Sequence, residues 1–213
     1  ELTLRLYAKT IEFAVLTWAG TLAIGFWIAY FLVFHVRNQL LSIGLFLLCT
    51  VPFWTSNIIR MISWIPLLGK EGLVNSALIG SGLVKQPLEF LLFSDFAVVV
   101  AYVHQLTIFM IVPIFNALTR IDKRTIEAAQ DAGATRWEIM RWIVFPLSRN
   151  GVALGSIFVL SIVMGDFFVV KVMSGGGSAS IVSALFEDIA VLQYPPAAAS
   201  AVVLLAFVVV MIA

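Results

Sequence analysis

Long runs of apolar residues, separated by short polar segments, are the main feature of this sequence. A helix needs about 20 mostly apolar residues to cross the roughly 30 Å of hydrocarbon in a bilayer. Strands of a membrane barrel would alternate between apolar and polar positions, and these runs do not. Pro195 and Pro196 suit the first turn of a final helix, where a missing N–H costs little. The pattern predicts membrane-spanning helices at about 13–34, 38–65, 96–119, 150–171 and 196–213.

Composition supports a membrane protein and excludes the other broad classes. Of the 213 residues, 62% are hydrophobic and 12% are charged, whereas soluble domains have roughly 45–50% and about 25%. A soluble domain of this size cannot bury so much apolar surface, and disordered chains are poor in apolar residues. Basic and acidic residues nearly balance, which gives no reason to expect nucleic acid as a partner. We therefore predict an all-α polytopic membrane protein, organised as a single membrane domain over 1–213.

The distribution of basic residues predicts the orientation of the spans, because Lys and Arg are enriched in cytoplasmic loops. Segment 120–148 and the short loop around Arg37 hold more of them for their length than the other connections do. We therefore name 120–148 the inner loop and expect the N-terminus outside and the C-terminus inside. Five spans that start outside lead us to expect an earlier span before Glu1, in a chain trimmed at both ends.

The inner loop carries helix signals of its own. Asp122 is suited to cap a helix that runs to Ala132, and Gly133 suits the left-handed residue that ends it. Thr135 and Glu138 have the spacing of a capping box, which starts a second helix. These signals alone leave two interpretations open, namely a hairpin that only connects two spans and a loop with a function of its own.

A spaced motif in the inner loop favours the second interpretation. Glu-Ala-Ala is followed after three residues by a glycine and after nine more by an apolar residue and a proline: Glu127-Ala128-Ala129, Gly133, Ile143 and Pro146. This pattern resembles the EAA signature of the permease subunits of bacterial ABC importers. Phe145 stands where that family usually has leucine, which is an exchange between apolar side chains.

The resemblance to type I ABC importer permeases covers most of the chain and implies a permease bundle. It implies that a short helix around Glu127–Ala132 docks into a separate ATPase subunit, with small alanines allowing close approach. The residues that the resemblance assigns to this coupling are Glu127, Ala128, Ala129, Asp131, Gly133, Ile143 and Pro146. It also implies a second permease subunit, two ATPase subunits and an external solute-binding protein as partners, in the inner membrane of a bacterium.

The resemblance extends to a branch of the family and thereby to a substrate class. Val51–Arg60 and Asp122–Gly133 look like the spermidine/putrescine branch, which implies a polyamine or a similar small polar amine as substrate. Sister branches that carry opines, amino acid derivatives, thiamine or ferric iron stay open as alternatives. An ion-coupled carrier is a further alternative, but it is expected to show more buried ionisable groups or inverted repeats.

We expect this chain to bind no cofactor and to have no enzymatic activity of its own. The phosphate-binding pattern G-x-x-x-x-G-K-[ST] does not occur in it, and Gly69-Lys70-Glu71 is the nearest fragment. ATP and Mg²⁺ are therefore expected on the partner ATPase. The only histidines, His35 and His104, lie in different parts of the chain, so no metal site is expected.

Polar residues inside the predicted spans are candidates for the substrate pathway. Irregular backbone with polar side chains is tolerated within a bilayer only against protein or a water-filled cavity, and Pro52 introduces such a break in the second span. The candidates are Trp54, Thr55, Asn57, His104 and Asp166. Each has a structural alternative: a kink satisfied by neighbouring helices, a histidine bonded to another helix, or pairing of Asp166 with Lys171.

Gly151-x-x-x-Gly155 is a pattern that allows two helices to pack closely. Two partners for this glycine face stay open, namely a helix of the same chain and the second permease subunit.

Overall fold

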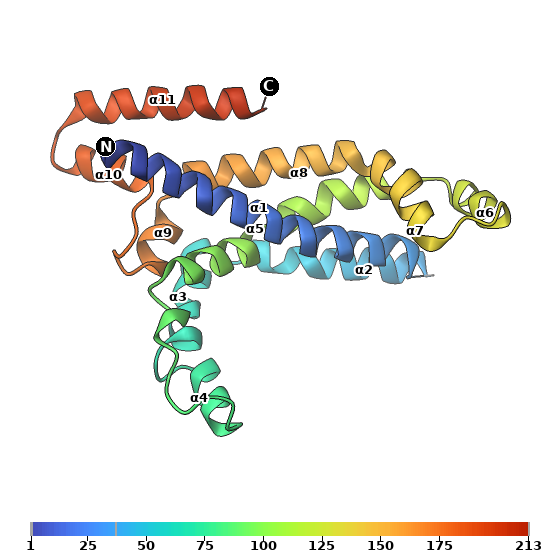
Figure 1. Ribbon diagram of the computed structural model, residues 1–213, viewed down its shortest axis with the longest axis horizontal. Coiled ribbons are helices and arrows are strands. Elements are labelled where there is room, and N and C mark those ends of the chain that lie inside the picture. Colours follow the sequence, from blue (N-terminus) through green and yellow to red (C-terminus); the bar gives the residue numbers. More distant parts are fainter. Residues whose placement is uncertain (1, 37, 213) are drawn as a thin grey trace. The chain divides into compact units, whose positions relative to one another are not determined.

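The computed structural model describes residues 2–36 and 38–212, and these residues are almost entirely helical (Figure 1). No strand occurs among them, which confirms the all-α prediction. Arg37, which contributed to the predicted orientation, lies outside the described residues. The long helices are α1 (Leu2–Phe34), α5 (Asp95–Leu118), α8 (Phe145–Gly165) and α11 (Tyr194–Ile212). The shorter helices are α2 (Gln39–Thr50), α3 (Asn57–Leu68), α4 (Leu73–Gly80), α6 (Lys123–Asp131), α7 (Arg136–Ile139), α9 (Phe168–Met173) and α10 (Ile181–Ala190).

Three further turns connect these helices: the 3₁₀ turns η1 (Val51–Trp54) and η2 (Glu89–Leu91) and the π-helical turn η3 (Met140–Val144). Within the described residues, four helices are long and apolar enough to cross a membrane. Their bounds are Thr3–Phe34, Asp95–Leu118, Arg136–Gly165 and Tyr194–Met211. A bent pair, Gln39–Trp54 with Asn57–Gly80, is a fifth candidate span. The chain is thus a polytopic membrane protein.

Two of the predicted spans are not continuous helices. The span expected over 38–65 is broken at η1, where Pro52 has no N–H to donate and the backbone tightens into a 3₁₀ turn before α3 begins. The span expected over 150–171 ends at Gly165, and α9 begins only at Phe168. Here Asp166 accepts the backbone N–H of Val169 at 2.9 Å, which starts a new helix.

The chain forms two compact units, and α1, α5 and α8 each contribute residues to both. The first unit consists of Glu1–Thr17, Thr55–Gln105 and Leu160–Ala213. The second unit consists of Trp18–Trp54 and Leu106–Val159, and it contains the whole inner loop. The single membrane domain stays a prediction.

In the second unit, α1 and α8 both approach α5 closely around Met110, whose side chain is fully buried. A Cβ on Gly25 of α1 would lie 3.0 Å from Met110 Cβ, and a Cβ on Gly155 of α8 would lie 2.6 Å from Met110 Sδ. One helical turn away, a Cβ on Gly151 would lie 2.6 Å from the carbonyl oxygen of Pro113. The glycine face of α8 therefore packs on α5 of the same chain, which decides between the two partners left open by the sequence.

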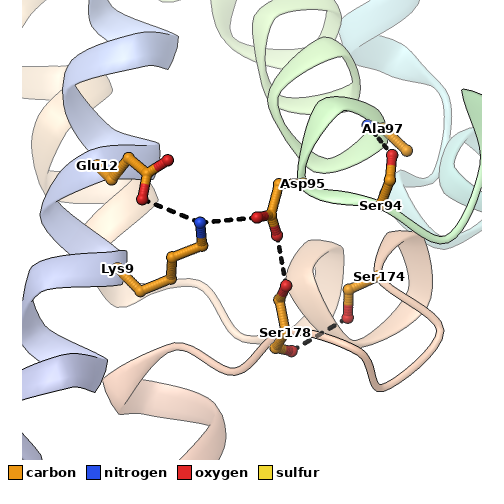
Figure 2. A network of polar contacts seen from close by, with 7 residues as sticks. All are labelled: Lys9, Glu12, Ser94, Asp95, Ala97, Ser174 and Ser178. Carbon is orange, nitrogen blue, oxygen red and sulfur yellow. Dashed lines mark hydrogen bonds and ion pairs between the residues drawn. The ribbon is translucent and has the colours of Figure 1, made fainter. Parts of the chain in front are cut away.

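In the first unit, a polar network joins α1 to the start of α5 and to the loop after α9 (Figure 2). Lys9 Nζ lies 2.7 Å from Asp95 Oδ2 and 2.9 Å from Glu12 Oε2. The Ser178 hydroxyl donates to the second oxygen of Asp95. One ammonium group and one carboxylate thus connect three segments that are far apart in the sequence.

The helix α11 packs against α10 in the first unit, and most of its side chains are exposed. Among the side chains of α11 whose burial is described, Ala197 is the one buried apolar residue. The hydroxyl of Tyr7 in α1 donates to the backbone oxygen of Ser200 at 2.9 Å. Pro195 and Pro196 lie in the first turn of α11, as predicted.

The buried side chain of Asn75 joins the two ends of the connection between α3 and α5. The Asn75 amide donates to the backbone oxygen of Gly69 at 3.0 Å and accepts the N–H of Leu88 at 2.8 Å. At the surface of the same segment, Lys70 Nζ lies 2.7 Å from Glu89 Oε1, and this ammonium group lowers the pKa of the Glu89 carboxyl below its usual value.

We expect Gly151→Ala to destabilise the protein, because the added methyl group would lie 2.6 Å from a backbone oxygen and 2.7 Å from Ala117 Cβ. Overpacking of this kind costs about 1–3 kcal/mol, so the apparent melting temperature of the detergent-solubilised protein should fall. Gly44→Ala is the matched control, since Gly44 lies inside α2 and an added Cβ there has nothing within 4 Å. That exchange should leave the melting temperature unchanged or raise it, because alanine favours a helix by about 1 kcal/mol over glycine. Equal melting temperatures of the two variants would contradict the packing of α8 on α5.

Candidate functional site

The first part of the inner loop folds as its caps predict. Asp122 Oδ1 accepts the backbone N–H of Arg124 at 2.9 Å, which caps α6 at its N-terminus. The helix ends at Asp131, and Gly133 follows with φ +84. Only glycine adopts that left-handed conformation without steric cost. The predicted start of this helix is confirmed, and its last residue is Asp131, one residue before the predicted Ala132. Both ends are determined by the chain itself.

The capping box at the start of α7 is also confirmed. Glu138 Oε2 accepts the backbone N–H of Thr135 at 2.7 Å and its hydroxyl at 2.8 Å. In return, the Glu138 N–H donates to Thr135 Oγ1 at 3.3 Å. These reciprocal bonds hold the connection between α6 and α7 in one geometry.

The wide turn η3 between α7 and α8 was not predicted. The N–H of Phe145 donates to the carbonyl oxygen of Met140, five residues earlier. Pro146 has no N–H, and in a regular helix its ring would clash with the carbonyl of the residue four positions before it. A π-helical turn widens the backbone at this point, and such turns are frequent at functional sites. The signal for it was a proline that follows directly on an apolar helical pattern.

The motif residues of the inner loop are mostly exposed. Ala129 and Ile143 are half-buried, and the side chains or backbone positions exposed to solvent are those of Glu127, Ala128, Asp131, Gly133 and Pro146. Among the exposed positions of α6, Ala128 has no side chain beyond Cβ and leaves the helix accessible to a partner there. Ile143 lies in η3 and Pro146 in the first turn of α8, so the second half of the motif coincides with the wide turn and its exit.

A polar cavity of about 590 Å³ lies beside α6 within the second unit. Its walls come from the end of α1, from α6, from α7 and from η3. The residues that line it are Tyr30, Phe34, His35, Ile126, Glu127, Gln130, Arg136, Ile139 and Val144. Glu127 is therefore accessible from solvent and also lines a cavity that holds the cationic group of Arg136.

The candidate pathway residues separate into different surroundings. Trp54 belongs to the second unit and is 85% exposed at the end of η1. Thr55, Asn57, His104 and Asp166 belong to the first unit. Within the first unit, α3 and α5 are in contact. The ring of His104 packs edge-on against Trp64 with centroids 5.3 Å apart.

Asp166 makes structural hydrogen bonds. Its carboxylate accepts the hydroxyl of the buried Tyr102 at 3.2 Å and the backbone N–H of Val169 at 2.9 Å. No ion pair joins Asp166 to Lys171, both of which the structure describes. The carboxylate thus ties the start of α9 to α5 within the first unit.

The first unit also contains several buried polar side-chain atoms that have no hydrogen-bond partner among the described residues. Among the described residues these atoms include Asn57 Oδ1, Arg60 Nε, Gln105 Oε1 and Ser161 Oγ. More than 90% of buried polar groups in proteins are hydrogen-bonded, so these atoms are suited to water or a ligand. Arg60 is held by a bond from Nη2 to the backbone oxygen of Thr55 at 3.1 Å. Gln105 and Ser161 were not among the candidates, although an amide beside His104 in an apolar span was a visible signal.

Comparison with known proteins finds a family and several similar chains. The model of the family described as "Binding-protein-dependent transport system inner membrane component" matches residues 21–213. The spermidine/putrescine transport system permease protein PotB of Haemophilus influenzae is 34% identical over 131 residues, which are 62% of this chain and 46% of that protein. PotB of Escherichia coli K12 is 31% identical over 166 residues, which are 78% of this chain and 59% of that protein. The chain thus spans about half the length of the curated relatives it matches.

A second kind of permease and one solved structure are also similar. PotC of Escherichia coli K12, also a spermidine/putrescine transport system permease protein, is 30% identical over 104 residues, 49% of this chain and 39% of that protein. The crystal structure of a bacterial alginate ABC transporter, in complex with an alginate pentasaccharide-bound periplasmic protein, superimposes with a TM-score of 0.76. The match covers 98% of this chain and 75% of the other at 17% sequence identity, and it shows a shared fold.

We expect Thr135→Ala to loosen the start of α7, because a methyl group can neither donate to Glu138 nor accept from its amide. Loss of an N-cap costs about 0.5–2 kcal/mol, so the Glu138 amide should exchange with deuterium about two- to thirtyfold faster. Thr125→Ala, at an exposed position inside α6, is the control and should leave that rate unchanged. An unaltered rate in Thr135→Ala would exclude the capping box as the support of this turn.

Proposed function

The chain belongs to the family of binding-protein-dependent transport system inner membrane components, and from this premise we propose that it is the permease subunit of a bacterial ABC importer. It lines the route of a substrate across the inner membrane. It makes and breaks no covalent bond itself, and ATP and Mg²⁺ bind to a separate ATPase subunit.

The observation that carries this proposal is the exposed helix α6 with its motif residues. In a loop that only connects two spans, an exposed helix with defined ends has no purpose. Asp122 and Gly133 determine where α6 begins and ends, and the capping box of Thr135 and Glu138 continues the chain into α7 without slack. A push on α6 is therefore transmitted through α7 and η3 into α8, which crosses the membrane.

The surface of α6 supports the proposed docking on the ATPase. Ala128 is exposed and has no side chain beyond Cβ, so a partner can approach the helix backbone. Glu127 offers a carboxylate to a basic group of the partner. Motion of the ATPase subunits would then shift α8 and switch the substrate cavity between its inside-open and outside-open forms.

The proposed substrate is a polyamine or another small polar amine. Permeases named for spermidine and putrescine are among the similar proteins. In the first unit, the buried oxygens Asn57 Oδ1 and Gln105 Oε1 have no hydrogen-bond partner among the residues that the structure describes. Amide oxygens accept hydrogen bonds from ammonium groups. Together these observations favour a substrate that is rich in N–H donors.

Arg60 supports a second candidate substrate class. The Nε atom of its guanidinium group is buried and has no hydrogen-bond partner among the described residues. A cation at this place would repel a polyamine and would attract a carboxylate. The alternative is therefore a permease for an opine or an amino acid derivative, both of which carry carboxylates.

The proposed assembly contains a second, related permease, two ATPase subunits and an external solute-binding protein. PotC is a second kind of permease with similarity to this chain. The alginate transporter of similar fold was crystallised with a periplasmic protein. Both observations support an assembly in which this chain is one of several subunits.

We expect Ala128→Trp to weaken binding of the ATPase, because the indole would fill the space between α6 and the wall of the ATPase cleft that receives it. Overpacking of a contact costs about 1–3 kcal/mol, so binding should weaken by about tenfold or more. The measurement is the amount of ATPase subunit recovered with the affinity-purified permease. Ala179→Trp, at an exposed alanine of the loop after α9, is the matched control and should recover as much ATPase as the wild type. Equal recovery with Ala128→Trp would contradict docking through α6.

We expect spermidine or putrescine, with its binding protein, to stimulate ATP hydrolysis by the complex reconstituted in lipid. Arg60→Gln distinguishes the two substrate classes, because removing the cation should favour an amine and impair a carboxylate substrate. A complex that responds to a carboxylate ligand and ignores polyamines would support the second class. An ATPase that never associates with the full-length chain would overturn the permease proposal itself.

A further inference from the structure

A second cavity of the second unit is lined almost wholly by aromatic and basic side chains. It measures about 630 Å³ and lies between the end of α1 and the start of α7 and η3. The residues that line this aromatic cavity are Trp27, Tyr30, Phe31, His35, Arg136, Trp137 and Met140. It shares Tyr30, His35 and Arg136 with the polar cavity beside α6.

The aromatic cavity has the residue types that are enriched where a membrane meets water. Trp27 is 58% exposed and Trp137 is 65% exposed, although both side chains are large and mostly apolar. Tryptophan and tyrosine gather at the membrane interface because their rings are apolar at one end and polar at the other. The candidate spans Thr3–Phe34 and Arg136–Gly165 both have an end at this cavity, and from this we infer a place near the membrane interface.

Arg136 carries the formal charge among the residues described as lining the aromatic cavity. No carboxylate is among those residues. Glu138, on the same helix, is bound to Thr135 in the capping box, and Glu127 lines the polar cavity instead. Arginine binds a phosphate group through two parallel N–H bonds.

The walls of the cavity are held in place by ring contacts. The ring of His35 stacks on Phe31 with centroids 5.7 Å apart, and Trp27 meets Tyr30 edge-on at 5.9 Å. A site of this size with aromatic walls is suited to the glycerol and upper acyl carbons of a lipid, while a single cationic group at its rim is suited to the phosphate.

We propose that the aromatic cavity binds one anionic phospholipid of the cytoplasmic leaflet. Its phosphate lies on the guanidinium group of Arg136, and its acyl chain follows Trp27, Phe31 and Met140 towards the bilayer. The bound lipid bridges α7 and the end of α1, next to the loop that carries the EAA motif. This proposal needs the membrane and the predicted orientation of the inner loop, but it does not depend on the identity of the transported substrate.

The test is native mass spectrometry of the full-length protein released from nanodiscs that contain equal amounts of phosphatidylglycerol and phosphatidylcholine. The wild type should retain one phosphatidylglycerol molecule, and Arg136→Gln should lower that occupancy by about tenfold, since it removes a charge-assisted phosphate contact. Arg149→Gln, which removes the same charge from an exposed position on α8, should retain the lipid as the wild type does. Arg136→Lys keeps the charge without the paired N–H groups and should give an intermediate occupancy.

The outcomes are distinguishable. Equal retention by Arg136→Gln and the wild type would overturn the site, as would equal loss in Arg149→Gln. Retention of phosphatidylcholine as strongly as phosphatidylglycerol would overturn the preference for an anionic lipid. Displacement by millimolar inorganic phosphate alone would point to a free-phosphate site and overturn the lipid. A photo-crosslinker at Trp137 should label lipid, and labelling of another protein subunit instead would identify the surface as a protein interface.

Discussion

The close approach of α1 and α8 to α5 around Met110 is the contact on which the second unit depends. Lipid tails are as apolar as the helices they surround, so helices in a bilayer associate through van der Waals fit and not through the hydrophobic effect. Gly25 and Gly155 provide that fit, because neither places a side chain where Met110 lies. The inner loop starts from α5 and ends on α8, and it is therefore anchored on two helices in direct contact. A displacement of a loop anchored in this way is therefore passed on to both helices.

The EAA motif combines two physical tasks. Glu127 and Ala128 are exposed and make few demands on their own chain, which leaves them available to a partner. Gly133, Ile143 and Pro146 instead determine the path of the backbone, through a left-handed residue and a wide turn. A motif of this kind specifies an exposed surface and also the backbone path that connects that surface to α8.

How much of the structure could be predicted depends on the range of the interaction that determines it. The ends of α6 and the capping box at Thr135 depend on neighbours within three residues, and they were predicted from the sequence. Gly151 and Gly155 indicated close packing, but the sequence could not say that the partner was α5. Asp166 was a candidate pathway residue from the sequence, and in the structure its carboxylate accepts the hydroxyl of Tyr102. No local sequence pattern specifies that partner.

The wide turn η3 has a consequence for the register of α8. A π-helical turn holds one more residue than an α-helical turn, and each residue of an α-helix adds a rotation of about 100°. All positions after Val144 are therefore rotated by one residue step from where an unbroken helix starting at Arg136 would place them. Without that step, Gly151 and Gly155 would face about 100° away from α5. The extra residue thus changes the rotation of α8 about its axis. In this way the wide turn before Pro146 determines which face of α8 contacts α5 inside the bilayer.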